Sequence, residues 1–592
     1  MSRNLNSKEK PTTPRLPNGA AWGTRVLALV LLLFFSVGFA FGQSSKLSKD
    51  LQSLPSGATT NVIVQYYSPP GKSDSNAASS VGATNGKALG LIKSTRYGMS
   101  AAAAQKLLSL DANVKYISVD RPVKGALNYA VAAVNADIAH NMGYNGSGVG
   151  IAVIDSGVNA VGDLGVPGWK NNSRLVYSQN FDPSANTTSD LYGHGTHVAG
   201  IIAGNGASSS CGNCNVTFVG IAPNANIINL RVLDQNGSAT DSTVIAAIQQ
   251  AISLKDTYNI RVINLSLGRG IFESYTTDPL CQAVEQAWNS GITVVVAAGN
   301  YGRDNSSNNG GYGTITSPGN DPYVITVGAM KTMGTATRTD DLIATYSSKG
   351  PTMLDHVVKP DIVAPGNLIV SDLASTSDTL YGLYPQNMVP VADYTSSNTA
   401  NISSTYYRLS GTSMAAPMVS GAVALLLQQN PLLTPDQLKA LLMKTAYKTF
   451  PQTSTYTDPT TGITYTDQYD IFTVGAGYLD VAAALTSTDL APATSGAAMS
   501  PTAGYDSTSG QVYLVNGSSV VWGTSVVWGT GVVWGTSVIW GTNTLGEAVL
   551  WGSSVCWGTS TSSGFSVVWG TGVVWGTKTN SDAMTVVIGG DK

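Results

Sequence analysis

Residues 148–157 read Gly-Val-Gly-Ile-Ala-Val-Ile-Asp-Ser-Gly, an apolar run that ends in a carboxylate and is bounded by glycines. The pattern predicts a buried strand over Val149–Ile154 with Asp155 at its C-terminal edge. In open α/β sheets, sites form at that edge. A carboxylate in this position can also simply cap a turn, so this segment alone leaves the role of Asp155 open.

Outward from this segment, short buried-type strands alternate with amphipathic helices between about residues 125 and 487. The further predicted strands are Ile227–Val232, Val262–Leu265, Thr293–Ala297 and Tyr323–Val327, and the predicted helices lie near 241–254, 280–289, 414–429 and 435–446. The last helix has an N-cap at Thr434, Pro435 in its first turn and Gln437 three residues after the cap. Because parallel strands need crossover connections, the alternation predicts an α/β domain with a mostly parallel sheet covered by helices on both faces.

Two further segments place reactive side chains at the beginnings of helices. Asp190-Leu-Tyr-Gly-His-Gly-Thr-His197 leads into Val-Ala-Gly-Ile-Ile-Ala, so His194 lies at the mouth of a helix. Gly411-Thr-Ser-Met-Ala-Ala-Pro417 places Ser413 at the start of an apolar helix, where unpaired N–H groups suit an oxygen that becomes negative. The spacing of His194 and His197, without a glutamate between them or a third histidine nearby, argues against a metal pair. We interpret His197 as a packed structural histidine.

The segments Asp-Ser-Gly, His-Gly-Thr-His and Gly-Thr-Ser-Met-Ala-Ala-Pro, in the order Asp, His, Ser, resemble the three signatures of the subtilase family of serine peptidases. They are separated by 39 and 219 residues. Chain order distinguishes this pattern from the chymotrypsin-like and α/β-hydrolase triads. The resemblance covers roughly residues 60–487 and implies a subtilisin-like three-layer fold and a serine endopeptidase of broad specificity.

The resemblance implies a role for each matching residue. Ser413 would attack the scissile carbonyl, His194 would take and return its proton, and Asp155 would orient and stabilise the imidazolium. Asn300, which ends Val-Val-Val-Ala-Ala-Gly-Asn, matches the residue whose side chain donates to the oxyanion. The substrate would bind as an added strand between two segments of the chain. These two segments are Ser266-Leu267-Gly268 and Gly237-Ser238.

The chain departs from the family pattern at three places. Met418 follows Pro417 where many members carry His, which leaves the chemistry untouched. About 45 residues separate the segment ending at Gly366 from Ser413, so residues 371–408 are expected to form an inserted loop near the cleft. Tyr301 follows Asn300 and is expected to narrow the primary pocket or make it aromatic.

The N-terminal residues predict export. Five Lys and Arg residues precede the apolar run Val26–Phe41, which is followed by Gly42. This pattern indicates a signal peptide over 1–42, cleaved near Gln43, and a secreted, extracellular or cell-surface protein. An uncleaved anchor is the alternative, but this run has 16 residues and roughly 20 are needed to span a bilayer.

Residues 43–125 predict a small α/β unit. Val62–Tyr67 and Val114–Val119 have the pattern of strands, and Ser100–Ser109 has that of a helix. The unit resembles the inhibitory propeptide of the family, which acts as an intramolecular inhibitor, so maturation is expected to cut between about Asp120 and Ala130. An ordinary extra domain is the alternative. The catalytic domain would then occupy residues 126–487.

The C-terminal part divides into a linker and a repeat. Residues 488–510 are rich in Ala, Thr, Ser, Pro and Gly and predict a linker. Residues 511–592 carry Ser-Val-Val-Trp-Gly-Thr units, with most tryptophans six or twelve residues apart. Because six is a multiple of two, Val and Trp would share one face of a β-rich repeat, expected to be a short solenoid with Cys556 buried. This tail is expected to bind a cell surface or to self-associate, and the alternative function is an adhesin or binding scaffold acting through it.

Composition excludes other classes. The net charge is −3 and there is no basic block, so nucleic acid is not expected as a partner; the expected partners are protein or peptide substrates.

Cys211 and Cys214 predict a local disulfide or two free thiols rather than a zinc or redox motif. Four histidines in 592 residues argue against a multi-histidine metal site, and no cofactor is expected to be required. The family often binds structural calcium, but the pattern assigns no ligands. A catalytically dead subtilase used as a scaffold is disfavoured because the triad and Asn300 are all present.

Overall fold

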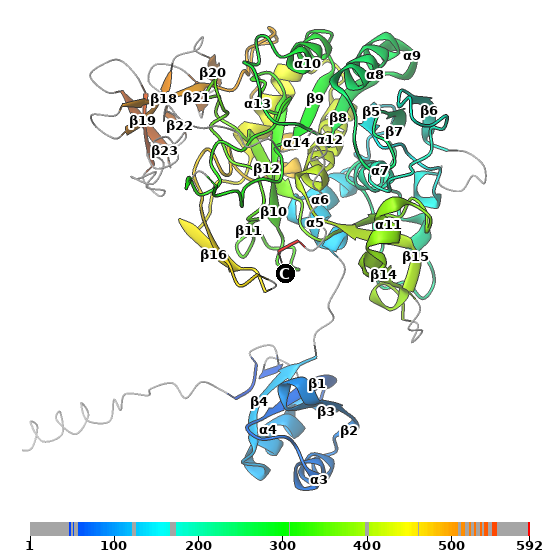
Figure 1. Cartoon of the computed structure of the whole chain (residues 1–592). Helices are drawn as coiled ribbons and strands as arrows, with labels where there is room; N and C mark the ends of the chain where they lie inside the picture. The colour runs from blue at the N-terminus through cyan, green and yellow to red at the C-terminus, as the bar shows by residue number, and fades with distance from the viewer. Residues whose placement is uncertain are drawn as a thin grey trace, which may run out of the picture. The chain divides into compact units, whose positions relative to one another are not determined.

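The structure is a computed structural model of the chain. It describes residues 46–48, 51–52, 57–120, 126–165, 173–306, 308–396, 402–459, 461–506, 511–515, 520–522, 526–528, 533–534, 538–542, 548–552 and 590–591. The contacts divide the chain into two compact units, Met1–Pro122 and Val123–Lys592 (Figure 1). The predicted signal peptide and Cys556 lie outside the described residues. Among the described residues, no helix is both long enough and apolar enough to cross a membrane.

The first unit is a four-stranded antiparallel sheet with two helices. The strand order is β2-β3-β1-β4. The strands are β1 (Thr59–Tyr66), β2 (Thr84–Leu89), β3 (Ser94–Ser100) and β4 (Val114–Val119), and the helices are α3 (Lys72–Ser80) and α4 (Ala101–Leu110). The predicted strands and helix are present as β1, β4 and α4, and the Ser100 side chain caps α4 by accepting from Ala103 N. The sequence analysis missed β2 because five of its six residues are exposed, so it has no apolar alternation.

The second unit, which contains the predicted catalytic residues and is called the catalytic unit below, is built on an eight-stranded sheet within the described residues. The order is β11-β10-β9-β8-β5-β7-β6, with β12 also paired to β10. The strands are β5 (Gly150–Asp155), β6 (Leu175–Asn180), β7 (Asn226–Arg231), β8 (Ile260–Leu265), β9 (Thr293–Ala297), β10 (Ile325–Lys331), β11 (Leu342–Ile343) and β12 (Ile362–Pro365). Every pair is parallel except β10 with β11, so the predicted mostly parallel sheet is confirmed.

Helices cover both faces of this sheet. The chain passes from β6 to β7 through α7 (Gly195–Ala203), and from β7 across β5 to β8 through α8 (Asp241–Ser253). Helix α10 (Pro279–Asn289) follows a step in the same direction as α8 and packs beside it, whereas α12 (Thr412–Gln429) packs against α7 (Figure 1).

The remaining helices complete the unit. They are α5 (Ala126–Ala133), α6 (Ala136–Asn141), α9 (Lys255–Tyr258), α13 (Pro435–Thr445) and α14 (Val481–Thr486). The predicted start of α13 is confirmed, because the Thr434 side chain accepts from Gln437 N and the Gln437 side chain accepts from Thr434 N. A hairpin that the sequence analysis missed, β16 (Thr453–Thr457) with β17 (Thr464–Gln468), follows this helix.

The inserted segment predicted over residues 371–408 has its own structure. Its elements are β13 (Ile369–Asp372), α11 (Thr379–Leu383), β14 (Met388–Pro390) and β15 (Ile402–Leu409), and its sheet has the order β13-β15-β14. Thr379 N donates to Leu191 O at 3.1 Å, and Leu380 N donates to Tyr192 O at 2.9 Å. The insertion is therefore bound to the backbone that immediately precedes His194.

The segment predicted as a linker is fixed to the catalytic unit as far as Ala503, whose N–H donates to His356 O at 2.8 Å. Ala491, Ala497, Ala498 and Ala503 are buried, and Ser500 accepts from the buried Lys439 ammonium at 2.8 Å. Lys439 and Lys359 both contact the Asp361 carboxylate, at 3.2 and 2.7 Å, and all three side chains are fully buried. Burial lowers the pKa of Lys439 to about 7. The sequence analysis missed this packing because small side chains and polar contacts provide it, and neither gives the segment a high hydrophobic content.

The described part of the tail consists of short strands. They are β18 (Thr502–Asp506), β19 (Gln511–Val515), β20 (Val520–Trp522), β21 (Val526–Trp528), β22 (Val533–Trp534), β23 (Val538–Thr542) and β24 (Ala548–Gly552). Their pairs are antiparallel, in sheets of order β18-β19-β24-β23-β22 and β20-β21. The described strands therefore pair antiparallel, and the expected solenoid of the whole repeat stays a prediction.

Candidate active site

Asp155 is the last residue of β5, a strand whose six residues are all buried. Strand β5 lies between β7 and β8, so its carboxyl end is at the middle of the sheet edge. The Oδ1 atom of Asp155 accepts from Ser156 N at 2.7 Å and from His194 Nδ1 at 2.8 Å. Its Oδ2 atom has no hydrogen-bond partner among the described residues. The residue is 1% exposed, so the carboxylate and the imidazole face each other away from water.

His194 occupies the N-cap position of α7, and the glycines beside it permit this approach. Gly193 has φ +101°, and a Cβ at Gly195 would lie 2.2 Å from the Gly157 carbonyl oxygen. Because Nδ1 donates to a carboxylate, the neutral ring presents Nε2 as an acceptor. Nε2 has no hydrogen-bond partner among the described residues. The ring is therefore arranged to receive a proton.

Asp190 fixes the turn that carries His194, a role that the sequence analysis did not assign. Its Oδ1 accepts from Gly193 N at 2.7 Å and from the Ser156 hydroxyl at 2.8 Å, and its Oδ2 accepts from Thr196 N at 2.8 Å. The Ser156 hydroxyl also accepts from Gly195 N at 2.9 Å. Burial raises the pKa of Asp190. A carboxylate before a glycine-rich helix start was the available signal, because such residues satisfy the first N–H groups of helices.

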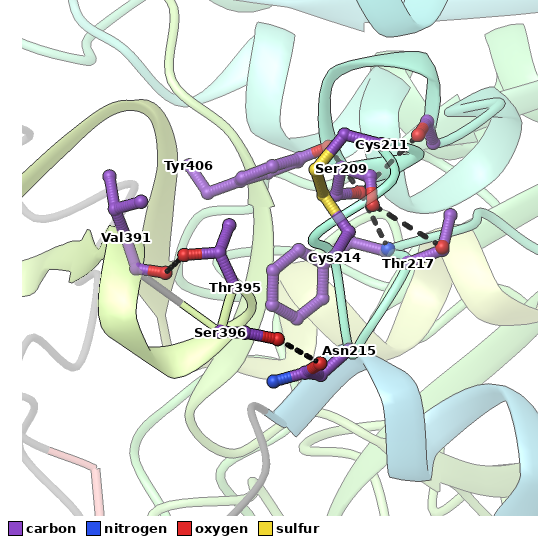
Figure 2. Close-up of a disulfide and its surroundings, with 11 residues drawn as sticks. Ser209, Cys211, Cys214, Asn215, Thr217, Val391, Thr395, Ser396 and Tyr406 are labelled. Carbon is purple, nitrogen blue, oxygen red and sulfur yellow. Dashed lines mark hydrogen bonds between the residues drawn. A yellow bond between two sulfur atoms is a disulfide. The ribbon is translucent and has the colours of Figure 1, made fainter. Parts of the chain in front are cut away.

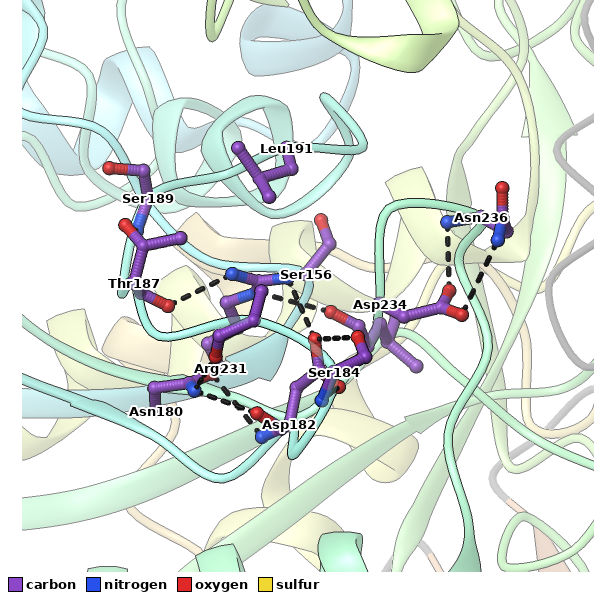
Figure 3. A network of polar contacts seen from close by, with 12 residues as sticks. Ser156, Asn180, Asp182, Ser184, Thr187, Ser189, Leu191, Arg231, Asp234 and Asn236 are labelled. Atoms are coloured by element: carbon purple, nitrogen blue, oxygen red, sulfur yellow. Dashed lines mark hydrogen bonds and ion pairs between the residues drawn. The ribbon is translucent and has the colours of Figure 1, made fainter.

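Arg231 supports the loop that leads to this turn (Figure 3). It is the last residue of β7, where it pairs with Asp155, and it is fully buried. Its guanidinium contacts Asp182 Oδ2 at 2.8 Å, Thr187 O at 2.9 Å and Leu233 O at 3.3 Å. A planar group with five donors can hold several acceptors of one loop at once. The sequence analysis missed Arg231 because its acceptors lie 44 and 49 residues away along the chain.

Ser413 is the second residue of α12 and is 7% exposed. Its hydroxyl donates to Ser266 O at 3.2 Å, while the Ser266 hydroxyl donates to Ser413 O at 2.8 Å. No hydrogen bond joins Ser413 to the His194 Nε2 atom, which has no partner among the described residues. Catalytic hydrogen bonds are often long or misaligned until substrate binds, so this geometry is that of a resting site.

A series of buried side-chain hydrogen bonds joins the end of β8 to the first turns of α12. The Ser420 hydroxyl donates to Asn264 Oδ1 at 2.8 Å, and Asn264 Nδ2 donates to the Ser266 hydroxyl at 2.9 Å. All three residues are fully buried. Asn264 therefore fixes β8 against α12 at the nucleophile, although it lies 156 residues from Ser420.

Asn300 follows β9 and faces the start of α12. Its Oδ1 atom accepts from Thr412 N at 2.9 Å and from the Thr412 hydroxyl at 3.1 Å. A backbone N–H requires an acceptor, so these contacts assign the amide orientation and turn Nδ2, the donor, to the other side. A Cβ at Gly411 would lie 3.2 Å from Asn300 Nδ2, so a side chain at that position would crowd the donor.

The two predicted substrate-binding segments differ in availability. Leu267 and Gly268 make no backbone hydrogen bond with other described residues, whereas Arg269 and Ser317 pair through both N–H and C=O groups at 2.9 and 2.8 Å. A Cβ at Gly268 would lie 2.5 Å from the Thr316 hydroxyl. Ser266 is fully buried and is occupied by Ser413. Leu267 and Gly268 are thus the part of this segment that can pair with a strand.

The prediction that Ser238 pairs with the substrate backbone, opposite Leu267 and Gly268, needs a correction. The N–H of Ser238 donates to Asp234 Oδ1 at 2.9 Å and its carbonyl accepts from Asp234 N at 2.9 Å, so both of its backbone groups belong to the turn. In the described residues, the Gly237 carbonyl and the Ala239 N–H make no backbone hydrogen bond. Gly237 itself has φ +76°, and a Cβ there would lie 2.8 Å from the Tyr192 ring. The groups available to an added strand therefore flank Ser238.

His197 is a structural residue, as predicted. It is fully buried, and its Nε2 atom is 3.2 Å from Ile369 O and 3.1 Å from Tyr407 O, both at the base of the insertion. Burial, followed by the nearby His194, lowers the pKa of His197 to about 3. In the part of the chain that the structure describes, no group of three or more His, Cys, Asp or Glu residues could hold a metal ion.

Cys211 and Cys214 form a disulfide, which settles the two alternatives left by the sequence (Figure 2). The bridge closes a turn in the loop after α7, where Cys214 N donates to Cys211 O at 3.0 Å. The next residue, Asn215, donates through its N–H to Tyr394 O at 2.8 Å and accepts from the Ser396 hydroxyl at 2.9 Å. The disulfide loop therefore packs against the insertion.

Comparisons with known proteins agree with this geometry. Residues 146–477 match the subtilase family, Peptidase_S8, which is more than half of the chain. Serine protease AprX of Bacillus subtilis is 37% identical over 350 residues, covering 57% of this chain and 71% of the relative. Subtilisin E of the same species is 33% identical over 348 residues, covering 58% and 73%.

A solved cold-adapted subtilisin-like serine proteinase is 31% identical, with a TM-score of 0.36 and coverage of 51% of this chain and 84% of that chain. The family match and the two curated relatives also confirm the subtilisin-like fold class, and they do not favour the adhesin interpretation. The chain belongs to the subtilase family and is a serine peptidase, a hydrolase that acts on peptide bonds.

Proposed function

We propose that this peptidase is an endopeptidase of broad specificity that works through an acyl-enzyme on Ser413. The observation that carries the proposal is the buried hydrogen bond of 2.8 Å between Asp155 and His194 Nδ1, which leaves Nε2 as the acceptor. On substrate binding, the Ser413 hydroxyl leaves Ser266 O and donates to His194 Nε2. His194 takes the proton as Ser413 attacks the carbonyl, and returns it to the leaving amine.

The oxyanion is stabilised by donors at the start of α12. Asn300 Nδ2 and the Ser413 backbone N–H donate to the carbonyl oxygen as it gains charge, and the helix N-terminus adds a positive potential. The fixed contacts of Asn300 with Thr412 support this role, because the amide need not reorient during the reaction. No cofactor is required by this chemistry.

Extended peptide substrates bind as a strand between Leu267-Gly268 and the turn at Gly237. On each side, backbone groups that make no backbone hydrogen bond with other described residues support this placement. Tyr301 narrows the primary pocket or makes it aromatic. The reaction then needs only a peptide in extended conformation, which favours unfolded proteins as substrates.

The precursor is exported and matures itself. The separate unit before Pro122 acts as the inhibitory propeptide, and residues 1–42 direct secretion. The tail binds a cell surface or self-associates. These proposals are supported by the family relationship, by the place of the first unit ahead of the catalytic unit in the amino-acid sequence, and by the apolar N-terminal run.

A single expression experiment tests the mechanism and the maturation. The precursor and its Ser413→Ala variant are produced in a protease-deficient host, and the products are analysed by N-terminal sequencing, intact mass and fluorophosphonate labelling. The unchanged chain should be cut between about Asp120 and Ala130 and should be labelled. The variant should remain unprocessed from about Gln43 and unlabelled. Normal maturation of the variant would refute self-processing, and labelling of the variant would refute Ser413 as the nucleophile.

A further inference from the structure

Gly590 and Asp591, near the end of the chain, lie in a polar pocket on the catalytic unit. Asp591 is 2% exposed, although the last described residue before Gly590 is Gly552, more than thirty residues earlier in the chain. Four residues of the unit line the pocket. They are Arg303, Lys331, Thr345 and Asn367.

Every polar group of Asp591 has a partner in this pocket. Oδ1 accepts from Arg303 Nη2 at 2.6 Å and from the Thr345 hydroxyl at 3.0 Å, and Oδ2 accepts from Thr345 N at 2.9 Å. Lys331 Nζ is 3.6 Å from Oδ2. Asn367 pairs with the backbone in both directions, donating to Asp591 O and accepting from Asp591 N, both at 2.9 Å. Charge-assisted bonds of this kind are the strong ones in proteins.

The cation that receives Asp591 is itself held in place. Arg303 Nε donates to the Thr345 hydroxyl at 2.7 Å, and its guanidinium lies 4.8 Å from the centre of the Tyr465 ring. Its Nη1 atom contacts Asp458 Oδ2 at 3.2 Å. Lys331 Nζ lies 4.5 Å from the centre of the Tyr456 ring. Arg303 and Lys331 thus meet two carboxylates at this pocket, Asp458 and Asp591. A third carboxylate, Asp467, interacts with Lys331 and Asp591 and is itself paired with Lys349. Buried charges need partners of this kind.

The shape of the pocket also selects the preceding residue. Gly590 has φ +54°, and a Cβ there would lie 2.6 Å from both Asn367 Oδ1 and the Ser410 hydroxyl. Ser410 is held in turn, because its hydroxyl accepts from Leu368 N at 2.8 Å. Only glycine fits both the backbone conformation and the space. The site therefore recognises a Gly-Asp pair.

We propose that Arg303, Lys331, Thr345 and Asn367 form a binding site for a Gly-Asp segment, and that its occupant is Gly590-Asp591 of the same chain. Thr502, in β18, pairs with Val357 of the catalytic unit, so residues 507–589 are attached to that unit at both ends. A cut within these residues then leaves the end of the chain bound to the catalytic unit. This inference goes beyond the proposed function and does not depend on peptidase activity.

The test uses the full chain carrying Ser413→Ala, so that the chain does not cut itself. A recognition sequence for a site-specific protease is placed between Lys578 and Thr579, the chain is cut, and gel filtration with mass spectrometry measures whether the fragment beginning at Thr579 stays bound. We expect retention when Asp591 is unchanged. Asp591→Ala and Asp591→Asn should weaken retention by at least about thirtyfold, because a buried charge loses its partner.

Asp458→Asn is the matched control, since it removes the other carboxylate of Arg303 and leaves every contact of Asp591 in place. It should retain the fragment within about threefold of the unchanged chain. Retention of the fragment by both Asp591 variants would overturn the proposal. Equal release by Asp458→Asn and Asp591→Ala would overturn it too, because Asp591 would then not be the residue that is recognised.

Discussion

Substituting Asn300 separates a structural role from a catalytic one, because its two amide atoms have different tasks. In Asn300→Ala, the fully buried Thr412 loses the acceptor of its N–H and of its hydroxyl. Two hydrogen bonds of about 0.5–1.5 kcal/mol each predict a loss of about 1–3 kcal/mol in the free energy of unfolding. The missing Nδ2 donor should also lower kcat and leave KM nearly unchanged, since the donor acts mainly in the transition state.

Asn300→Asp is the informative partner of this variant. Its carboxylate keeps an acceptor for both Thr412 contacts at a helix start, where a negative charge is favourable, so Tm should be retained. It loses the donor and places a charge beside a developing one, so kcat should fall at least as far as in Asn300→Ala. The expected loss of about 10²–10³-fold is the value known for such a donor in a subtilisin, a relative of this chain.

The assay is steady-state kinetics on active-site-titrated mature enzyme, with thermal unfolding of the same preparations. An Asp variant with unchanged kcat would remove Asn300 from the mechanism. An Asp variant that loses as much stability as the Ala variant would refute the assignment of the amide orientation.

Three further predictions concern stability. Replacing Cys211 and Cys214 by Ser opens a loop of four residues, for which the chain-entropy relation gives about 2 kcal/mol, and thermal unfolding that is unchanged would contradict this. Asp361→Asn leaves two buried lysines uncompensated and should cost about 3–5 kcal/mol in urea unfolding; a loss below about 1 kcal/mol would show that the ion pairs are dispensable. Burial and then the charge of Glu285 raise the pKa of Asp321 to about 8, so the folded state holds its proton more tightly than the unfolded state. Stability should therefore fall as pH rises from about 4 to about 8, by at most about 1.4 kcal/mol per pH unit, and Asp321→Asn should flatten that slope in urea unfolding measured across this range.

The fold and the central residues of the site could be predicted because their geometry is local. Contiguous residues determine the buried strand that ends in Asp155 and the helices that begin near His194 and Ser413. Parallel strands joined by crossovers then have their carboxyl ends at one edge of the sheet. The roles of the remaining groups depend on distant partners. Asn264 meets Ser420 156 residues away, and no periodicity announces such a contact.

Two expectations failed for a different reason. A turn motif does not say which of its backbone groups it uses internally, so Ser238 was assigned to substrate although the turn occupies both of its groups. Residues 488–510 were assigned to a linker from their composition. Buried alanines and a hydrogen bond to Lys439 fix this segment to the catalytic unit as far as Ala503, and neither contributes to an apolar pattern.

The attachment of the insertion to Leu191 and Tyr192 constrains how this enzyme can be re-engineered. Loop exchange is a common way to transplant specificity between relatives, and a shorter segment in place of residues 373–401 would look like a surface change. Here the exchange would remove Thr379 N and Leu380 N, which donate to the carbonyl oxygens of Leu191 and Tyr192. These two carbonyl groups lie just before Gly193 and His194 in the chain. An exchange that keeps the catalytic geometry must therefore replace the insertion and the residues around His194 together.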